Sequence, residues 1–190
     1  MIRRPPRSTL DRSSAASDVY KRQALLELLC APDHPIGVLG LLDYWMLPNQ
    51  EWQHAGQVSD AYLEAMAAIT DLLVRYYADR ISHWEIWNEP DYQATHLAAG
   101  DYARLLTALS ATVKQANPQA QVVFGGLGSA DWVAARYFGE VVQQLPAGQA
   151  PYDIFAIHPY PSHEFRRAGR LIRDPSYLHS LAPTVLERFM

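Results

Sequence analysis

Apolar and polar positions follow two kinds of pattern from residue 24 onward. Short continuous apolar runs are typical of strands buried on both faces, and between them apolar residues recur at helical spacing. The runs that predict strands cover residues 35–43, 83–88, 121–126 and 152–158. The helical stretches cover residues 59–79, 101–115, 131–144 and 176–189. Ser59 is the expected N-cap of the first of these helices.

Four strands separated by three helices predict an α/β protein with a parallel sheet. The doubly wound sheet and the (β/α)8 barrel both have this pattern. A doubly wound sheet often carries a phosphate loop after its first strand, but the chain has no GxGxxG or Walker pattern, and Gly125-Gly126-Leu127-Gly128 is too short a match. Barrel enzymes place their chemistry at the carboxyl ends of the strands. Polar and aromatic residues lie at the predicted ends: Asp43-Tyr44-Trp45, Asn88-Glu89, Ser129 and His158-Pro159-Tyr160. We therefore predict a partial (β/α)8 TIM barrel.

The composition excludes several classes of protein. A content of 49% hydrophobic and 19% charged residues predicts a globular domain. Residues 24–190 hold ten basic and eighteen acidic side chains, which disfavours nucleic acid and anionic membrane partners. The most apolar stretch, residues 36–47, is shorter than the roughly 20 residues of a membrane span. No protein partner is indicated, and the single Cys30 leaves the compartment undecided.

The first 23 residues differ from the rest in having six basic and two acidic side chains and no hydrophobic periodicity. An organellar transit peptide is one interpretation. The string also resembles translated sequencing-adapter DNA, an interpretation that we favour. The domain would then cover residues 24–190, and we expect the true N-terminal part of the gene to be missing. The localisation is undetermined, with secretion one option.

Glu89 is the first candidate for chemistry, because an apolar strand runs directly into Asn88 and Glu89. A carboxyl group at a strand tip beside Trp87 and Pro90 is expected to be partly desolvated, which favours the protonated form that a general acid needs. Hydrolysis of a glycoside requires such an acid and a second carboxylate facing it. A glutamate that starts a helix, with Pro90 in the first turn, is the alternative. The chemistry alone leaves both interpretations open.

His158 and Tyr160 are the second candidates. In an extended chain they share a face, so Tyr160 could donate to a carboxylate and His158 to a substrate hydroxyl. A histidine at a strand end is more often structural, and that alternative stays open. The seven histidines show no HxH or HExxH spacing, so we predict neither a metal site nor a cofactor.

Two of these motifs resemble a known family. Trp84-Glu85-Ile86-Trp87-Asn88-Glu89-Pro90 resembles the acid/base signature on strand four of the clan A glycoside hydrolases. Ile157-His158-Pro159-Tyr160 resembles the strand-six motif of the same clan. Residues 24–190 are similar to the region from before strand three to after strand six, in the manner of families 5 and 39. The resemblance implies a carbohydrate substrate and retaining hydrolysis of O-glycosidic bonds.

The resemblance also implies roles for single residues. Glu89 would be the general acid/base, Asn88 the ligand of the sugar 2-hydroxyl, and His158 and Tyr160 neighbours of the nucleophile and the sugar. Trp45 and Trp132, just past strands three and five, are candidate stacking platforms. Trp52 and Tyr92 could serve equally well, and each of these aromatics could simply be core. Glu85 is expected inside the barrel below Glu89, where a buried charge needs a partner.

The nucleophile of this family is a glutamate near the end of strand seven. Glu164 and Glu187 do not lie in such a context, so we expect the nucleophile beyond Met190 and expect the chain alone to be inactive. A non-catalytic carbohydrate-binding relative with the same barrel is the alternative.

Overall fold

The computed structural model describes residues 24–30, 36–47, 58–92, 95–128, 132–148 and 150–158. Strands and helices alternate in the predicted order, after a short helix at residues 24–29. The strands are β1 (Leu39–Leu42), β2 (His83–Ile86), β3 (Gln121–Leu127) and β4 (Ile154–Ile157). The helices are the 3-10 turn η1 (Tyr44–Met46), α3 (Asp60–Tyr76), α4 (Ala99–Ala116) and α5 (Trp132–Gln144). Residues 1–23, Trp52, Tyr160 and the predicted helix at 176–189 lie outside the described residues.

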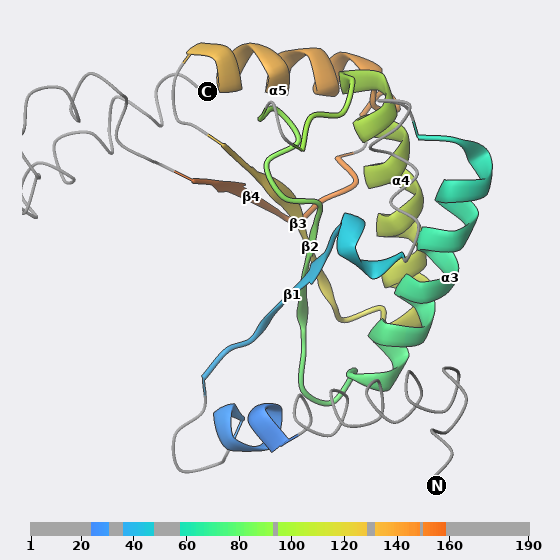
Figure 1. Ribbon diagram of the computed structural model, residues 1–190, viewed down its shortest axis with the longest axis vertical. Helices are drawn as coiled ribbons and strands as arrows, with labels where there is room; N and C mark the ends of the chain where they lie inside the picture. The colour runs from blue at the N-terminus through green and yellow to red at the C-terminus, as the bar shows by residue number, and fades with distance from the viewer. Residues whose placement is uncertain are drawn as a thin grey trace, which may run out of the picture.

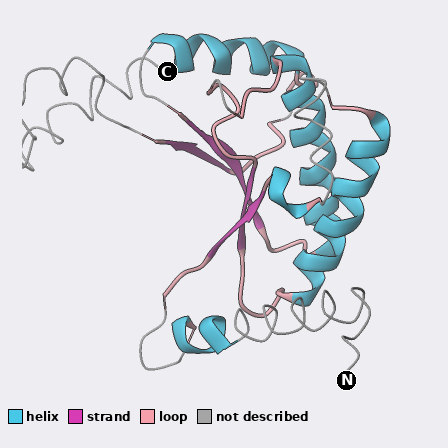
Figure 2. Cartoon of the chain, viewed as in Figure 1, coloured by secondary structure: helices cyan, strands magenta, loops and turns pink. Residues whose placement is uncertain are grey.

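The four strands form one parallel sheet in the order β1-β2-β3-β4. Ile86 of β2 is in register with Leu42 of β1 and Phe124 of β3. Helices α3, α4 and α5 lie on one side of this twisted sheet (Figure 1), and Figure 2 shows the strands and helices of the same view in separate colours. Parallel strands that alternate with helices on one face are the arrangement of a partial (β/α)8 barrel, so the predicted fold class is confirmed.

The core lies between the sheet and the three helices. The helical spacing of residues 101–115 predicts that Leu105, Leu109 and Val113 share one face, and α4 buries all three. In α3 the helical spacing predicts a buried stripe of Tyr62, Met66, Ile69, Leu73 and Tyr76. The structure buries Tyr62, Met66, Thr70 and Val74, so the buried face differs from the prediction in the second half of the helix. None of the helices in the described ranges is both long and apolar enough to cross a membrane.

Strand β1 differs from the prediction of a strand buried on both faces. Its side chains alternate, with Leu42 fully buried toward the core while Leu39 and Leu41 are 49% and 43% exposed. Leu42 belongs to the core cluster, whereas Leu39 and Leu41 lie on the opposite face of a strand that has one neighbour in the described sheet. The continuous apolar run therefore reflects a strand that is apolar on both faces but covered on one.

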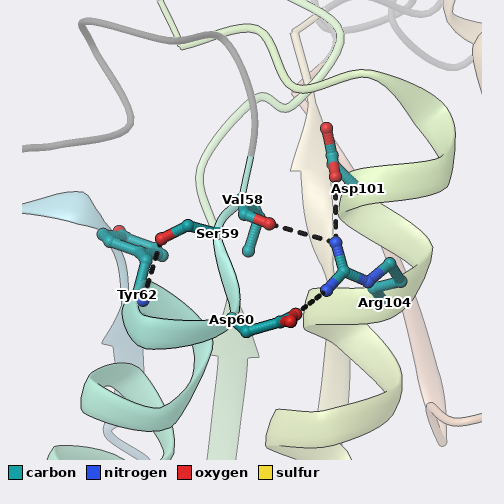
Figure 3. Close-up of polar contacts among 6 residues, drawn as sticks. All are labelled: Val58, Ser59, Asp60, Tyr62, Asp101 and Arg104. Atoms are coloured by element: carbon teal, nitrogen blue, oxygen red, sulfur yellow. Dashed lines mark hydrogen bonds and ion pairs between the residues drawn. The ribbon is translucent and has the colours of Figure 1, made fainter.

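Helices α3 and α4 are linked at their N-termini (Figure 3). Ser59 caps α3, since its hydroxyl accepts a hydrogen bond of 3.1 Å from the Tyr62 amide, as the sequence predicts. The Arg104 side chain donates to the Val58 carbonyl at 3.0 Å and pairs with the carboxylates of Asp60 and Asp101. In an alternating parallel sheet these helix starts follow the carboxyl ends of β1 and β2. Arg104 of α4 therefore ties the start of α3 to the first turns of α4.

Candidate active site

The backbone after β2 turns sharply at two non-glycine residues. Trp87 has a φ of 70° and Glu89 a φ of 51°, both in the left-handed region. For residues with a β-carbon this region costs about 1–2 kcal/mol each. Hydrogen bonds from the Trp87 amide to the Leu42 carbonyl (2.9 Å) and from the Glu89 amide to the Gly126 carbonyl (3.0 Å) hold the turn in place. The two neighbouring strands thus fix the conformation that presents Glu89.

Trp87 anchors this turn from inside. Its ring is fully buried, its indole N–H donates to the Thr95 carbonyl at 2.9 Å, and its ring centroid lies 5.3 Å from that of Tyr44. The Thr95 hydroxyl in turn donates to the Glu89 carbonyl at 2.6 Å. Thr95, in the loop after β2, therefore contacts both Trp87 and Glu89. These two hydrogen bonds restrict the rotation of the Glu89 backbone.

The Glu89 side chain meets His158 at the end of β4. His158 Nδ1 lies 2.7 Å from Glu89 Oε1, and the two side chains are 29% and 15% exposed. The His158 amide donates to the Leu127 carbonyl at 2.8 Å, which continues the β3–β4 pairing past the last strand residue. Glu89 and His158, 69 residues apart in the chain, are therefore in direct contact. The sequence pointed His158 at a substrate hydroxyl, whereas the structure places its ring against Glu89 itself.

Glu85 lies in the interior beneath this pair, with only 7% of its surface exposed. Its Oε1 accepts a hydrogen bond of 2.6 Å from the Gly126 amide. A backbone N–H of β3 is therefore a partner that the structure shows for this buried carboxyl group.

Asp91 is a residue of the site that sequence reasoning missed. Its Oδ1 accepts from the Gly128 amide at 2.7 Å, which joins the loop after β2 to the end of β3. An aspartate two residues after a candidate acid, opposite a glycine-rich strand end, was the available signal.

The candidate stacking aromatics lie on the surface and not in the core. Trp45 and Trp132 are each 67% exposed, and Tyr92 is 54% exposed. Trp45 stacks at a tilt on Tyr44, which also contacts Trp87. Trp132 begins α5, the helix that follows β3. Asn88 is partly buried between Trp87 and Glu89. Tyr160 and Trp52 lie outside the described residues, as do the histidines beyond His158.

The side chains of the described segments form no group of three or more His, Cys, Asp or Glu that could hold a metal ion. What the site offers chemically is a carboxyl group that can gain or lose a proton next to an imidazole that can donate to it or accept from it.

No protein-family model and no characterised protein matches the sequence at a significant level. The fold is similar to a solved structure described as a psychrophilic glycoside hydrolase family 10 endo-β-1,4-xylanase, with a TM-score of 0.56 and 14% sequence identity. The match covers 75% of this chain and 51% of the xylanase, so the chain spans about half the length of that enzyme. At this identity the likeness establishes the barrel-type fold. This structure belongs to family 10, whereas the sequence motifs were compared with families 5 and 39 of clan A.

Proposed function

We propose that residues 24–190 are part of the catalytic domain of a retaining glycoside hydrolase in which Glu89 is the general acid/base. The observation that carries the proposal is the contact between Glu89 and His158 at the tip of the sheet, held by a left-handed backbone. A costly backbone conformation around a partly buried carboxyl group is typical of functional sites. The fold likeness to a xylanase supports a carbohydrate as the substrate.

In the proposed reaction, protonated Glu89 gives its proton to the glycosidic oxygen as the bond to the sugar breaks. The resulting carboxylate accepts a hydrogen bond from His158 when the imidazole carries its proton on Nδ1, which stabilises the charge. In the second step the carboxylate takes a proton from the attacking water. Asn88 is proposed to bind the sugar 2-hydroxyl, with His158 and Tyr160 near the sugar and Trp45 and Trp132 as stacking surfaces.

A retaining mechanism also needs a second carboxylate about 5–5.5 Å from the first, which becomes the covalent nucleophile. The proposal places this carboxylate outside the described residues. Because neither Glu164 nor Glu187 has the sequence context of that nucleophile, we expect the chain as given to show no turnover by itself, and a test of Glu89 uses the remaining strands of a barrel.

The test is a chimera in which this chain, from residue 24, replaces the structurally equivalent half of a family 10 xylanase that keeps its own nucleophile. Two aryl β-xylosides are compared, one with a good and one with a poor leaving group. Glu89→Ala should slow the poor leaving group by about 10²–10⁴-fold and the good one far less, because only the former needs a proton from the acid. Added azide should restore the reaction of the Ala variant in the water-dependent step.

The matched control is Glu64→Ala, which removes an exposed glutamate on α3 and should leave both rates unchanged. Equal losses for the two leaving groups on Glu89→Ala would argue against a general acid. A chimera that binds xylo-oligosaccharides but never cleaves them, with Trp45→Ala and Trp132→Ala weakening binding, would favour the second candidate. That candidate is a non-catalytic carbohydrate-binding relative, and the exposure of both tryptophans is the observation that supports it.

A further inference from the structure

The glycine run Gly125-Gly126-Leu127-Gly128 at the end of β3 has no role in the function proposed so far. Its pairing with β4 is irregular: Phe124 pairs with Phe155 but Leu127 pairs with Ile157, so β3 has one more residue than β4 between these pairs. Such a bulge leaves backbone groups without their usual partners in the ladder. Two side chains from other elements take them up. The Gly125 amide donates to the Tyr102 hydroxyl at 2.8 Å, and the Gly126 amide donates to Glu85 at 2.6 Å.

Gly126 has no room for a side chain, and the reason is His158. A β-carbon added to Gly126 would overlap Nε2 of the His158 ring and lie 2.7 Å from its Cδ2. The backbone of Gly126 is outside the left-handed region, so an alanine could adopt its conformation. The imidazole ring is therefore what requires glycine at this position, because it packs directly on the α-carbon.

The same residue also contacts the other member of the pair. The Gly126 carbonyl accepts the hydrogen bond from the Glu89 amide, while Glu85 holds the Gly126 amide from below. Gly126 thus positions both the Glu89 backbone, through its carbonyl, and the His158 ring, through its α-carbon. These are the two positions that determine whether Nδ1 reaches Oε1.

We propose that Gly126 is a positioning residue of the Glu89–His158 pair. The imidazole packs on the α-carbon of Gly126, and Glu85 holds the Gly126 backbone in place through its hydrogen bond to the amide. This inference rests on the proposed function for its catalytic meaning. A side chain at position 126 would push the ring outward and separate it from the carboxylate, without touching the substrate or the reacting atoms.

The packing of His158 on Gly126 can be tested on the intact 190-residue chain by NMR of ¹⁵N-labelled histidine. In the wild type, Glu89→Gln should shift the ring nitrogen resonances of His158, because it replaces the carboxylate that the ring contacts. In a Gly126→Ala background the same Glu89→Gln change should leave those resonances where they are. Gly139→Ala is the matched control, since a β-carbon there meets nothing within 4 Å, and it should preserve the full effect.

Urea unfolding provides a second measurement should Gly126→Ala fold poorly. Gly126→Ala should lower the unfolding midpoint, and combining it with His158→Ala should return the midpoint to that of His158→Ala alone, because the ring that clashes is gone. An equal loss in both backgrounds would mean that the glycine serves the strand and not the ring, which would overturn the proposal. So would an undiminished effect of Glu89→Gln on His158 in the Gly126→Ala chain.

The positioning role is then tested by the kinetics of the xylanase chimera, in which Gly126→Ala should lower kcat and leave KM unchanged. A purely structural glycine would lower the amount of folded enzyme and leave kcat per folded molecule unaltered. The NMR and unfolding results do not depend on hydrolysis. The NMR and unfolding results could confirm the positioning role of Gly126 while Glu89→Ala shows no leaving-group dependence. In that case the proposed function fails and the packing of His158 on Gly126 still stands.

Discussion

At the scale of single residues, the site depends on a backbone that is unfavourable for the residues it carries. Glu89 and Trp87 both have positive φ values, and neither is a residue type that favours them. The sequence identified Glu89 by its position after an apolar strand. It could not reveal the left-handed turn or the contact with His158, because both arise from hydrogen bonds to β1 and β3 and from the bulge at Gly125-Gly126.

This strain gives a prediction about stability at position 89. Glu89→Gly and Glu89→Ala both remove the carboxylate, but glycine takes a φ of 51° without cost. The Gly variant should therefore be more stable than the Ala variant by about 1 kcal/mol in urea unfolding. The matched pair Glu64→Gly and Glu64→Ala, in the interior of α3, should show the reverse order by about 1 kcal/mol. If alanine is the more stable residue at both positions, the left-handed turn is not present in solution.

At the scale of elements, the hydrophobic pattern predicted the order and type of the four strands and three helices that surround the site. The Ser59 cap and the buried face of α4 are confirmed in detail. The pattern could not predict that β1 is covered on one face only, since an apolar run does not show what lies against it. Nor could it reveal links between elements distant in sequence, such as the contact of Asp153 with Lys114.

Asp153 joins the start of β4 to α4 and β3, and its protonation should affect stability. Burial pushes the pKa of Asp153 upward, but hydrogen bonds from Lys114 (2.7 Å) and from the Val122 amide (2.8 Å), with the Lys114 charge, outweigh it and hold the pKa below its ordinary value of 3.8. A carboxyl group whose pKa is lowered on folding stabilises the fold at pH values above its ordinary pKa. This contribution is lost as the pH falls through the pKa of the group in the folded state.

Asp153→Asn should therefore lower the free energy of unfolding by about 1 kcal/mol at pH 7, a modest figure because the pair is partly solvated. The difference from the wild type should shrink as the pH falls below about 4, where the wild type loses the same interaction. Asp71→Asn removes an exposed pair with Arg75 within α3 and should lower the urea midpoint less than Asp153→Asn does. A difference for Asp153→Asn that stays constant down to acidic pH would contradict this assignment.

At the scale of the whole molecule, the described sheet has helices on one face and exposed apolar side chains at its first strand. Leu39 and Leu41 of β1 are 49% and 43% exposed, and Ile36, three residues before the strand, is 56% exposed. Exposed apolar groups along an end strand favour pairing with another chain. The intact chain should therefore self-associate as its concentration rises, in a way that depends on this face of β1 and not on the face that packs against the helices.

Replacing one leucine on each face of β1 separates these two effects. Leu39→Lys places a charge on the exposed face, so it should reduce the concentration dependence of sedimentation while changing the free energy of unfolding by less than about 0.5 kcal/mol. Leu42→Lys, three residues further along the same strand, places a charge in the fully buried face and should unfold the chain, since an unpaired charge there costs several kcal/mol. If Leu39→Lys destabilises the chain as much as Leu42→Lys does, both faces of β1 are buried in solution. The face of β1 that carries Leu39 and Leu41 would then be covered in solution by another part of the protein or by a second copy. That outcome would match the strand buried on both faces that the apolar run predicts.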